Sequence, residues 1–174
     1  MVRQVQPGEA FKHKYPEWID LVVSRGADGH VNVMPVGWSM LASGSPVLYA
    51  VAINAKHHTT RLIRETREFV VATPSASMGP ATRYCGTHSG RDGDKIGPSG
   101  LELVPATAVQ VPLLAGAVYN LECVLRTEVE TGDHITFVGE VVVAHLDEEA
   151  GERLMNFGVR WACAQEIVET VYEP

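Results

Sequence analysis

Two long segments in which apolar and polar residues alternate restrict the fold of this chain more than any other feature. Ala117 to Val129 (AVYNLECVLRTEV) and His134 to His145 (HITFVGEVVVAH) are the longest such runs, and Thr131-Gly132-Asp133 joins them. Strict alternation is typical of a half-buried β-strand, and a short connection that contains glycine is typical of a hairpin. The sequence therefore predicts an antiparallel hairpin here.

Shorter strand patterns occupy much of the remaining chain. They are rich in β-branched and apolar residues and are bounded by turn signals such as Asp28-Gly29. The expected strands are Trp18–Ser24, His30–Ser39, Val47–Asn54, Glu68–Thr73, Leu101–Ala106 and Val109–Pro112. A total of about seven or eight short strands with few helices favours a barrel or a sandwich over the alternation of a parallel sheet.

Three short helices are expected, at Thr60–Thr66, Ser77–Cys85 and Asp147–Asn156. Thr59 or Thr60 is suited to be the N-cap of the first, and Pro80 lies near the start of the second. Residues 1–16, which are polar and contain two prolines, are interpreted as an N-terminal arm that packs on a partner.

The length, net charge and cysteine count of the chain limit the classes of function. A length of 174 residues fits one domain, 1–174, and a formal net charge of −7 argues against nucleic acid as the partner. No apolar run approaches the ~18 residues of a membrane span, and the first residues lack the apolar core of a signal peptide. The odd number of widely spaced cysteines favours reduced thiols, and we expect a cytoplasmic protein.

The stretch from Asn32 to Thr60 combines two strand patterns with unusual chemistry. Pro35 and Gly37 fall within the first strand pattern, which suits a sheet edge or a place where a ligand approaches the backbone. The second strand pattern runs into Lys56 and two histidines before the expected helix. The first N–H groups of a helix attract anions. We therefore expect a flat apolar ligand with a phosphate tail.

Five segments in the same order resemble a known family. They are NVMPVGW (32–38), SPVLYAVAIN (45–54), HHTTRLI (57–63), CGTHSGRDGDK (85–95) and GDHITFVGEV (132–141). Together they resemble the flavin reductase-like, FMN-binding split-barrel family, which includes flavoredoxins, archaeal ferric reductases and the reductase components of two-component monooxygenases. The resemblance spans Trp18 to Val143 and implies a mainly β, six-stranded antiparallel Greek-key split barrel with a few short helices. It also implies a homodimer with FMN near the subunit interface.

The resemblance assigns cofactor-binding residues position by position. The strand along the isoalloxazine ring would provide Asn32, Met34, Pro35, Val36, Trp38 and Ser39. The ring edge and ribityl chain would meet backbone groups of Ala52, Ile53 and Asn54. The phosphate would be held by His58, Thr59 and Thr60, and the loop closing over it would provide Ser89, Gly90, Arg91, Asp94 and Lys95. Ile96 departs from the family pattern, because many relatives have an aromatic residue there.

Each assignment has a simpler alternative. The threonines at 59 and 60 could only cap a helix, Trp38 could only be core, and residues 89–95 could be a solvated loop. His57, His58, Cys85 and His88 match no closed zinc pattern, so no metal site is assigned.

The function implied is an NAD(P)H-dependent FMN reductase that passes electrons to free flavin, ferric iron or an acceptor protein. The flavin carries the chemistry, so no obligatory catalytic side chain is named. A Gly-x-Gly-x-x-Gly fingerprint is missing, so the nicotinamide nucleotide would stack transiently on the flavin. The alternatives are a non-enzymatic FMN electron carrier of the flavoredoxin type and a binding module without flavin.

Overall fold

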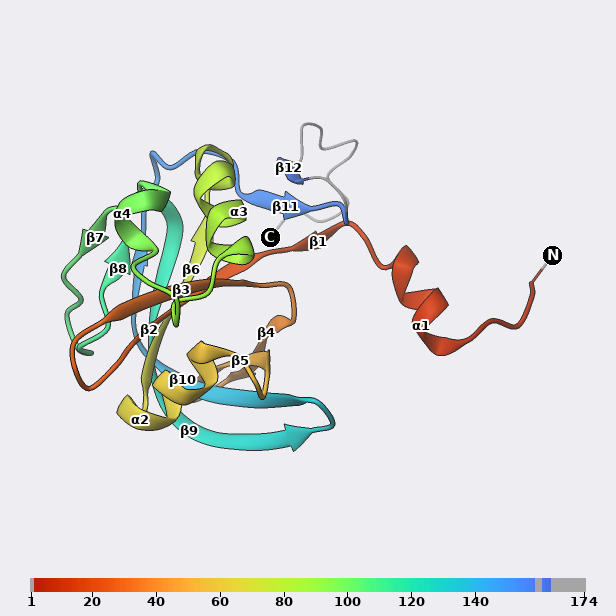
Figure 1. Cartoon of the computed structure of the whole chain (residues 1–174), viewed down its shortest axis with the longest axis horizontal. Coiled ribbons are helices and arrows are strands. Elements are labelled where there is room, and N and C mark those ends of the chain that lie inside the picture. Colours follow the sequence, from red (N-terminus) through yellow and green to blue (C-terminus); the bar gives the residue numbers. More distant parts are fainter. Residues whose placement is uncertain (1, 159–160, 164–174) are drawn as a thin grey trace.

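A computed structural model describes residues 2–158 and 161–163 (Figure 1). The strands are β1 (Glu17–Trp18), β2 (Asp20–Arg25), β3 (Val31–Val36), β4 (Ser39–Gly44), β5 (Val47–Asn54), β6 (Glu68–Pro74), β7 (Leu103–Val104), β8 (Leu113–Leu114), β9 (Ala117–Thr131), β10 (His134–Leu146), β11 (Leu154–Asn156) and β12 (Trp161–Cys163). The helices are α1 (Pro7–Ala10), η1 (Phe11–His13), α2 (His58–Thr66), η2 (Ala76–Met78), α3 (Gly79–Thr87) and α4 (Ile96–Ser99). No helix in this part of the chain is long and apolar enough to cross a membrane.

One antiparallel sheet of seven strands dominates the fold, in the order β3-β2-β6-β9-β10-β5-β4. Strand β5 pairs with β10 and not with its sequence neighbour β6, which makes a Greek-key connection. The sheet curls, and α2 packs against β2, β3 and β5 (Figure 1). The expected mainly β barrel with few short helices is confirmed, with seven strands in this sheet where six were expected.

The predicted hairpin is β9 and β10, and its two-residue loop is Gly132-Asp133. Gly132 has φ +73°, a backbone conformation that glycine adopts at little cost. His134 pairs with Thr131 across the loop, and the ladder continues to Leu146 opposite Tyr119. The hairpin prediction is therefore confirmed, with strands slightly longer than the alternation indicated.

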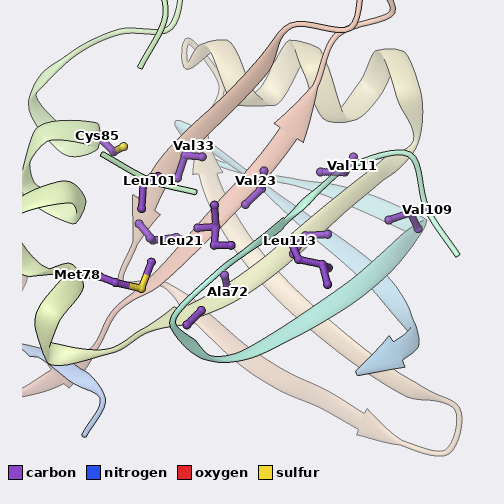
Figure 2. Close-up of a cluster of buried hydrophobic side chains, with 13 residues drawn as sticks. Leu21, Val23, Val33, Ala72, Met78, Cys85, Leu101, Val109, Val111 and Leu113 are labelled. Carbon is purple, nitrogen blue, oxygen red and sulfur yellow. The ribbon is translucent and has the colours of Figure 1, made fainter. Parts of the chain in front are cut away.

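The core has two parts because successive residues of a strand point to opposite faces of the sheet. Val22, Phe69 and Phe137 lie in the cluster inside the curled sheet. Leu21 and Val23 belong to a second cluster on the other face. Figure 2 shows that Cys85 of α3 and four residues of the following segment, Leu101, Val109, Val111 and Leu113, belong to this second cluster. Strand β2 is buried on both faces and holds the two clusters together.

A buried carboxylate fixes the segment that covers the second cluster. Glu122 is fully buried and accepts hydrogen bonds from the backbone N–H groups of Thr107, Ala108 and Val109 at 2.8, 2.6 and 2.9 Å. His145 Nε2 lies 2.6 Å from Glu122 Oε1. Burial acts to raise the pKa of Glu122, but the contacts with His145 and the backbone outweigh it and hold that pKa below its ordinary value. Glu122 thereby accepts the backbone hydrogen bonds that a neighbouring strand would otherwise accept from this irregular segment.

Three sequence-based predictions about elements are wrong. The strand expected at Val109–Pro112 does not form, because the carboxylates of Glu122 and Glu68, and not a neighbouring strand, accept from the N–H groups of Val109 and Gln110. Residues 39–44, interpreted as strand end and turn, form the separate strand β4, because pairing with β5 satisfies their backbone groups and only Ser45-Pro46 remains as turn. The helix expected at Asp147–Asn156 does not form. Asp147 Oδ1 accepts a hydrogen bond from Glu149 N at 3.0 Å, Gly151 has φ +76°, and β11 pairs with β1. A side-chain-stabilised turn and a left-handed glycine both oppose helix continuation.

Candidate functional site

Strand β3 lies at the end of the seven-stranded sheet, and two cavities meet along it. In the described residues β3 pairs only with β2, which confirms the edge position that Pro35 predicted. One cavity, the wide cleft, has a volume of about 850 Å³, and the other, the polar pocket, of about 320 Å³. Met34, Pro35 and His57 line both. A ligand along β3 can therefore occupy both cavities at once.

The wide cleft has mostly apolar walls. Its lining includes Met34, Pro35, Val36, Gly37, Trp38, Ala52, Ile53, Asn54 and His134. Ala52 N donates to Trp38 O at 2.8 Å, which ties the bend between β3 and β4 to β5. The Trp38 side chain is 54% exposed, and its ring centroid is 4.6 Å from that of His134. Trp38 is therefore a cleft residue and not core, contrary to the simpler alternative.

The N-terminal arm forms the opposite wall of the wide cleft. Gly8, Phe11, Lys12, Lys14, Tyr15 and Glu17 line it, together with Phe157 and Gly158. Lys14 forms an ion pair with Glu17, whose Oε1 accepts a hydrogen bond from Asn156 Nδ2 at 3.0 Å. Lys14 Nζ also lies 5.5 Å from the centroid of the Trp38 ring. No site role was predicted for these residues, because no local sequence pattern indicates that the N-terminal arm returns to a strand.

The polar pocket contains a buried lysine. Lys95 is 4% exposed, and no carboxylate in the described residues lies within the 4.0 Å that an ion pair requires. Burial lowers the pKa of Lys95, and the nearby thiol of Cys85 opposes that shift only partly. A buried cation without a counter-charge is costly. An anion in this pocket would relieve that cost.

The start of α2 lies at the same pocket, but its cap is not the predicted one. The N-cap is His57, which has an extended backbone (φ −71°, ψ 150°) and makes no side-chain capping bond. Thr59 Oγ1 accepts from Asn32 Nδ2 at 2.8 Å, and Thr60 Oγ1 donates to Asn54 O at 2.9 Å. Neither threonine caps the helix, so its first N–H groups are available to an anion.

Gly90, in the loop over the polar pocket, lies close to the start of β3. A Cβ on Gly90 would lie 2.2 Å from Asn32 Oδ1, so no other residue fits there without a shift. Asn32 Oδ1 and His58 Nδ1 are both buried and lack a hydrogen-bond partner in the described structure. Burial, and then the positive charges of Arg61 and Arg91 among others, lowers the pKa of His58. A polar group bound in the polar pocket would supply the hydrogen-bond partners that these two buried atoms lack.

The loop from Ser89 to Lys95 is ordered over the polar pocket. Arg91 Nη2 donates to Lys56 O at 2.5 Å and so joins the loop to the segment before α2. Asp94 Oδ1 and Oδ2 accept from the N–H groups of Ile96 and Gly97 at 2.9 and 3.0 Å. These backbone bonds lower the pKa of Asp94. Ile96, the departure from the family pattern, packs against the cluster shown in Figure 2.

Most of the predicted residues line one of the two cavities, and Ser39, Thr60 and Asp94 are the exceptions. Asn32, His58, Thr59, Ser89, Gly90, Arg91 and Lys95 line the polar pocket, and Val36, Trp38, Ala52, Ile53 and Asn54 line the wide cleft. Ser39 lines neither, because its Oγ donates at 2.7 Å to Asp20 Oδ2, inside the barrel. Thr60 lines neither cavity, because its hydroxyl is used by Asn54 O. Asp94 lines neither, because its carboxylate accepts hydrogen bonds from the N–H groups of Ile96 and Gly97.

Sequence reasoning gave no role to Gly86 and Thr87, which line the polar pocket from the end of α3 beside His88. A Cβ on Gly86 would lie 2.9 Å from Pro35 Cγ, so this glycine sets how closely α3 approaches β3. Gly86 belongs to the CGTHSGRDGDK segment, which is the signal that was available. No group of three or more potential metal ligands occurs in the part of the chain that the structure describes.

Comparisons with known proteins agree with this architecture. Residues 12–162 match a family model described as a flavin reductase like domain. An uncharacterised protein of Archaeoglobus fulgidus is 41% identical over 78% of this chain and 76% of its own length. The NADH-dependent FAD reductase of Streptomyces globisporus is 30% identical over 75% of this chain and 70% of its own. The structure of an FMN-binding protein from Thermus thermophilus with bound 1-cyclohex-2-enone has a TM-score of 0.80 and 28% identity, and the match covers 98% of each chain.

Proposed function

This chain belongs to the flavin reductase-like family, and from that premise we propose that it binds FMN and transfers electrons from NADH or NADPH to an acceptor. The observation that carries the proposal is Lys95. A cation 96% shielded from solvent and without a carboxylate partner in the described residues lies beside the uncapped start of a helix. Both features favour one dianionic phosphate.

The residues of the polar pocket fit a phosphate monoester. The Lys95 ammonium and the first N–H groups of α2 would supply donors, and the Thr59 hydroxyl, which accepts from Asn32, keeps its own hydrogen to donate. Arg91 closes the pocket through its bond to Lys56 O. The roles of these residues toward FMN are part of the proposal.

The wide cleft fits the ring. Pro35 and Val36 present an apolar edge that cannot complete a strand ladder at Pro35, so a flat ligand meets the backbone there. A bound flavin would supply the capacity to accept a hydride and to release electrons singly or in pairs. The protein orients the ring and limits the access of water to it. No side chain is assigned as acid or base.

Space remains in the wide cleft for a second planar molecule. Its volume of about 850 Å³ is near the upper end of small-ligand sites, which span roughly 300–1,000 Å³. Lys12 and Lys14 on the arm bring positive charge to its outer wall. A nicotinamide nucleotide, whose ring is flat and whose phosphates are anionic, matches that wall in shape and charge. The acceptor would be free flavin, ferric iron or a partner protein.

The decisive experiment is the visible spectrum of freshly purified protein, with the cofactor identified after release by heat, followed by anaerobic addition of NADH or NADPH. We expect FMN, and rapid bleaching of its visible absorbance on addition of the nucleotide. FMN that does not bleach with either nucleotide would instead indicate an electron carrier. Protein that takes up neither FMN nor FAD on titration would overturn the flavin assignment.

We also propose a homodimer in the cytoplasm. Strands β4, β5, β9 and β10 expose an apolar groove of about 590 Å³ whose lining includes Leu41, Val47, Val142 and Leu146. Leu41 and Leu146 are 63% and 69% exposed and belong to one contiguous apolar groove, a feature typical of protein interfaces. A second copy is the occupant that the family resemblance implies, and light scattering on the purified protein tests it.

A further inference from the structure

Exposed aromatic side chains gather in the wide cleft. Among the described phenylalanine, tyrosine and tryptophan side chains, five are exposed, and all of these except Trp18 line this cleft. The four are Phe11 and Tyr15 from the N-terminal arm, Trp38 from the bend between β3 and β4, and Phe157 from the segment after β11. We call these four residues the aromatic wall. Exposed rings that meet from three separate segments indicate a surface that another aromatic group covers.

Two rings of the aromatic wall are fixed by contacts within the protein. Lys14 Nζ lies 5.3 Å from the centroid of the Tyr15 ring and 5.5 Å from that of the Trp38 ring. Gly158 packs on the Tyr15 ring, because a Cβ there would lie 3.1 Å from Tyr15 Cδ2. The ring of His134 lies against the Trp38 ring at 4.6 Å between centroids. The aromatic wall is therefore organised before a ligand binds, which reduces the cost of binding.

The polar groups beside the aromatic wall largely satisfy one another. Lys14 forms an ion pair with Glu17, and Glu17 also accepts a hydrogen bond from Asn156. Lys12 is exposed on the arm, where solvent screens its charge. A flat ligand with little charge fits such a surface better than a polyol chain or a chelate with ligands on all sides. A cleft walled by the arm also favours a small molecule over a protein.

We propose that the aromatic wall binds a small planar quinone as the electron acceptor. The inference rests on the proposed function and names an acceptor class for the same cleft. Quinones are flat and uncharged, and flat rings stack on aromatic side chains. The aromatic wall and Pro35 line the same cavity, so the quinone would share it with a flavin ring along β3.

The overall reaction balances with the nicotinamide nucleotide as the reductant. The nucleotide loses a hydride, which carries two electrons and one proton, and solvent supplies a second proton. Both carbonyl oxygens of the quinone become hydroxyls. The nucleotide is oxidised and the quinone is reduced to a hydroquinone by the same two electrons.

The first test measures the binding of menadione, a planar naphthoquinone, to the FMN-loaded full chain by isothermal titration calorimetry without a nucleotide. Phe11→Ala should weaken menadione about twofold to tenfold, the range of one aromatic contact, and should change FMN affinity less than twofold. Phe11 is 67% exposed, so the substitution leaves the core intact. The matched control is Trp18→Ala, at an exposed aromatic residue that lines neither the wide cleft nor the polar pocket.

Electron transfer provides a second measurement on the same variants. After anaerobic reduction with NADH or NADPH, the menadione concentration that gives half the maximal rate of reoxidation should rise in Phe11→Ala and not in Trp18→Ala. The corresponding concentration of ferric citrate should stay the same in both variants, because this chelate is not planar and does not stack on a ring.

The outcomes separate this inference from the proposed function. A loss of menadione affinity confined to Phe11→Ala supports the quinone site. FMN-loaded protein that does not bind menadione, or that binds it equally well without the Phe11 ring, overturns the quinone site while the flavin site stands. A dimer that Phe11→Ala dissociates in light scattering would assign the aromatic wall to a second copy and also overturn it. Protein that takes up neither FMN nor FAD overturns the proposed function itself.

Discussion

Replacement of Lys95 by methionine tests whether this lysine binds a ligand or stabilises the fold, because the two roles predict different effects on FMN affinity and on the stability of the apo-protein. Lys95 is 4% exposed, lines the polar pocket and has no carboxylate partner in the described chain. Methionine keeps the length and apolar stem of the side chain but removes the charge. Removal of a lysine that forms an ion pair within the fold would destabilise the protein. Removal of a lysine whose charge is paired only by a bound phosphate would not destabilise the apo-protein.

The magnitude follows from the contact that is lost. A hydrogen bond to a charged group contributes about 1.5–3 kcal/mol, which corresponds to roughly 10- to 150-fold in affinity. Lys95→Met should therefore weaken FMN by at least about tenfold. The melting temperature of the apo-protein should stay the same or rise, because an unpaired buried charge is removed.

Riboflavin provides the internal control, since it has the ring and ribityl chain of FMN without the phosphate. Lys95→Met should leave riboflavin affinity within about twofold, and Lys56→Met, at an exposed lysine of the same pocket, should cost FMN less than about threefold because solvent screens it. Calorimetric titration and thermal melting of apo-protein measure the two effects. Parallel losses for FMN and riboflavin, or a clear fall in apo-protein melting temperature, would refute the reasoning.

The protonation of Lys95 determines whether FMN affinity rises or falls with pH. Burial lowers the pKa of Lys95 in the free protein, whereas a bound phosphate stabilises the charged form. FMN affinity should therefore fall as pH rises through the lowered pKa of Lys95, before the ordinary lysine pKa of about 10.4 is reached. In the apo-protein the same shift makes stability rise with pH between the lowered and the ordinary pKa, because the unfolded chain binds more protons there. Lys95→Met should remove both trends.

Three further predictions concern other parts of the molecule. Gly90→Ala should weaken FMN at least about tenfold, because its Cβ would lie 2.2 Å from Asn32 Oδ1, whereas Gly44→Ala, with open space around it, should have no effect on FMN titration. Glu122→Gln should lower the free energy of unfolding at neutral pH by about 1–3 kcal/mol in urea titrations. Because the folded-state pKa of Glu122 is depressed, wild-type stability is lost as pH falls through that pKa, and the variant should lose less. Leu41→Glu should convert the proposed dimer to monomer in light scattering while leaving the apo-protein melting temperature per subunit little changed, because Leu41 is 63% exposed; a dimer that persists would place the interface elsewhere.

Local chemistry in the sequence determined much of the scaffold. Alternation over residues 117–145 and the Gly132 turn predicted the β9–β10 hairpin, and Pro35 predicted an edge strand. The ordered segments that carry the family resemblance predicted the barrel. Most of the residues that these segments assign to the flavin line one of the two cavities, and their contacts with a flavin stay a prediction. These features can be predicted from the sequence because the alternation of side chains along a strand and the φ that glycine adopts in a turn are local properties of the chain.

The tertiary structure decided what each polar side chain does. Asn32 Nδ2 donates a hydrogen bond to Thr59 Oγ1, 27 residues away in sequence. Thr59, which was expected to cap a helix, therefore lines the polar pocket instead. Ser39 lies inside the barrel because Asp20 accepts a hydrogen bond from its hydroxyl. The resemblance already assigned Lys95 to the site, but only the folded structure shows that Lys95 is buried with no carboxylate partner among the described residues. Hydrogen-bond partners and desolvation arise between segments that are remote in the chain, so no local pattern encodes them, and only the packed barrel assigns these residues their roles.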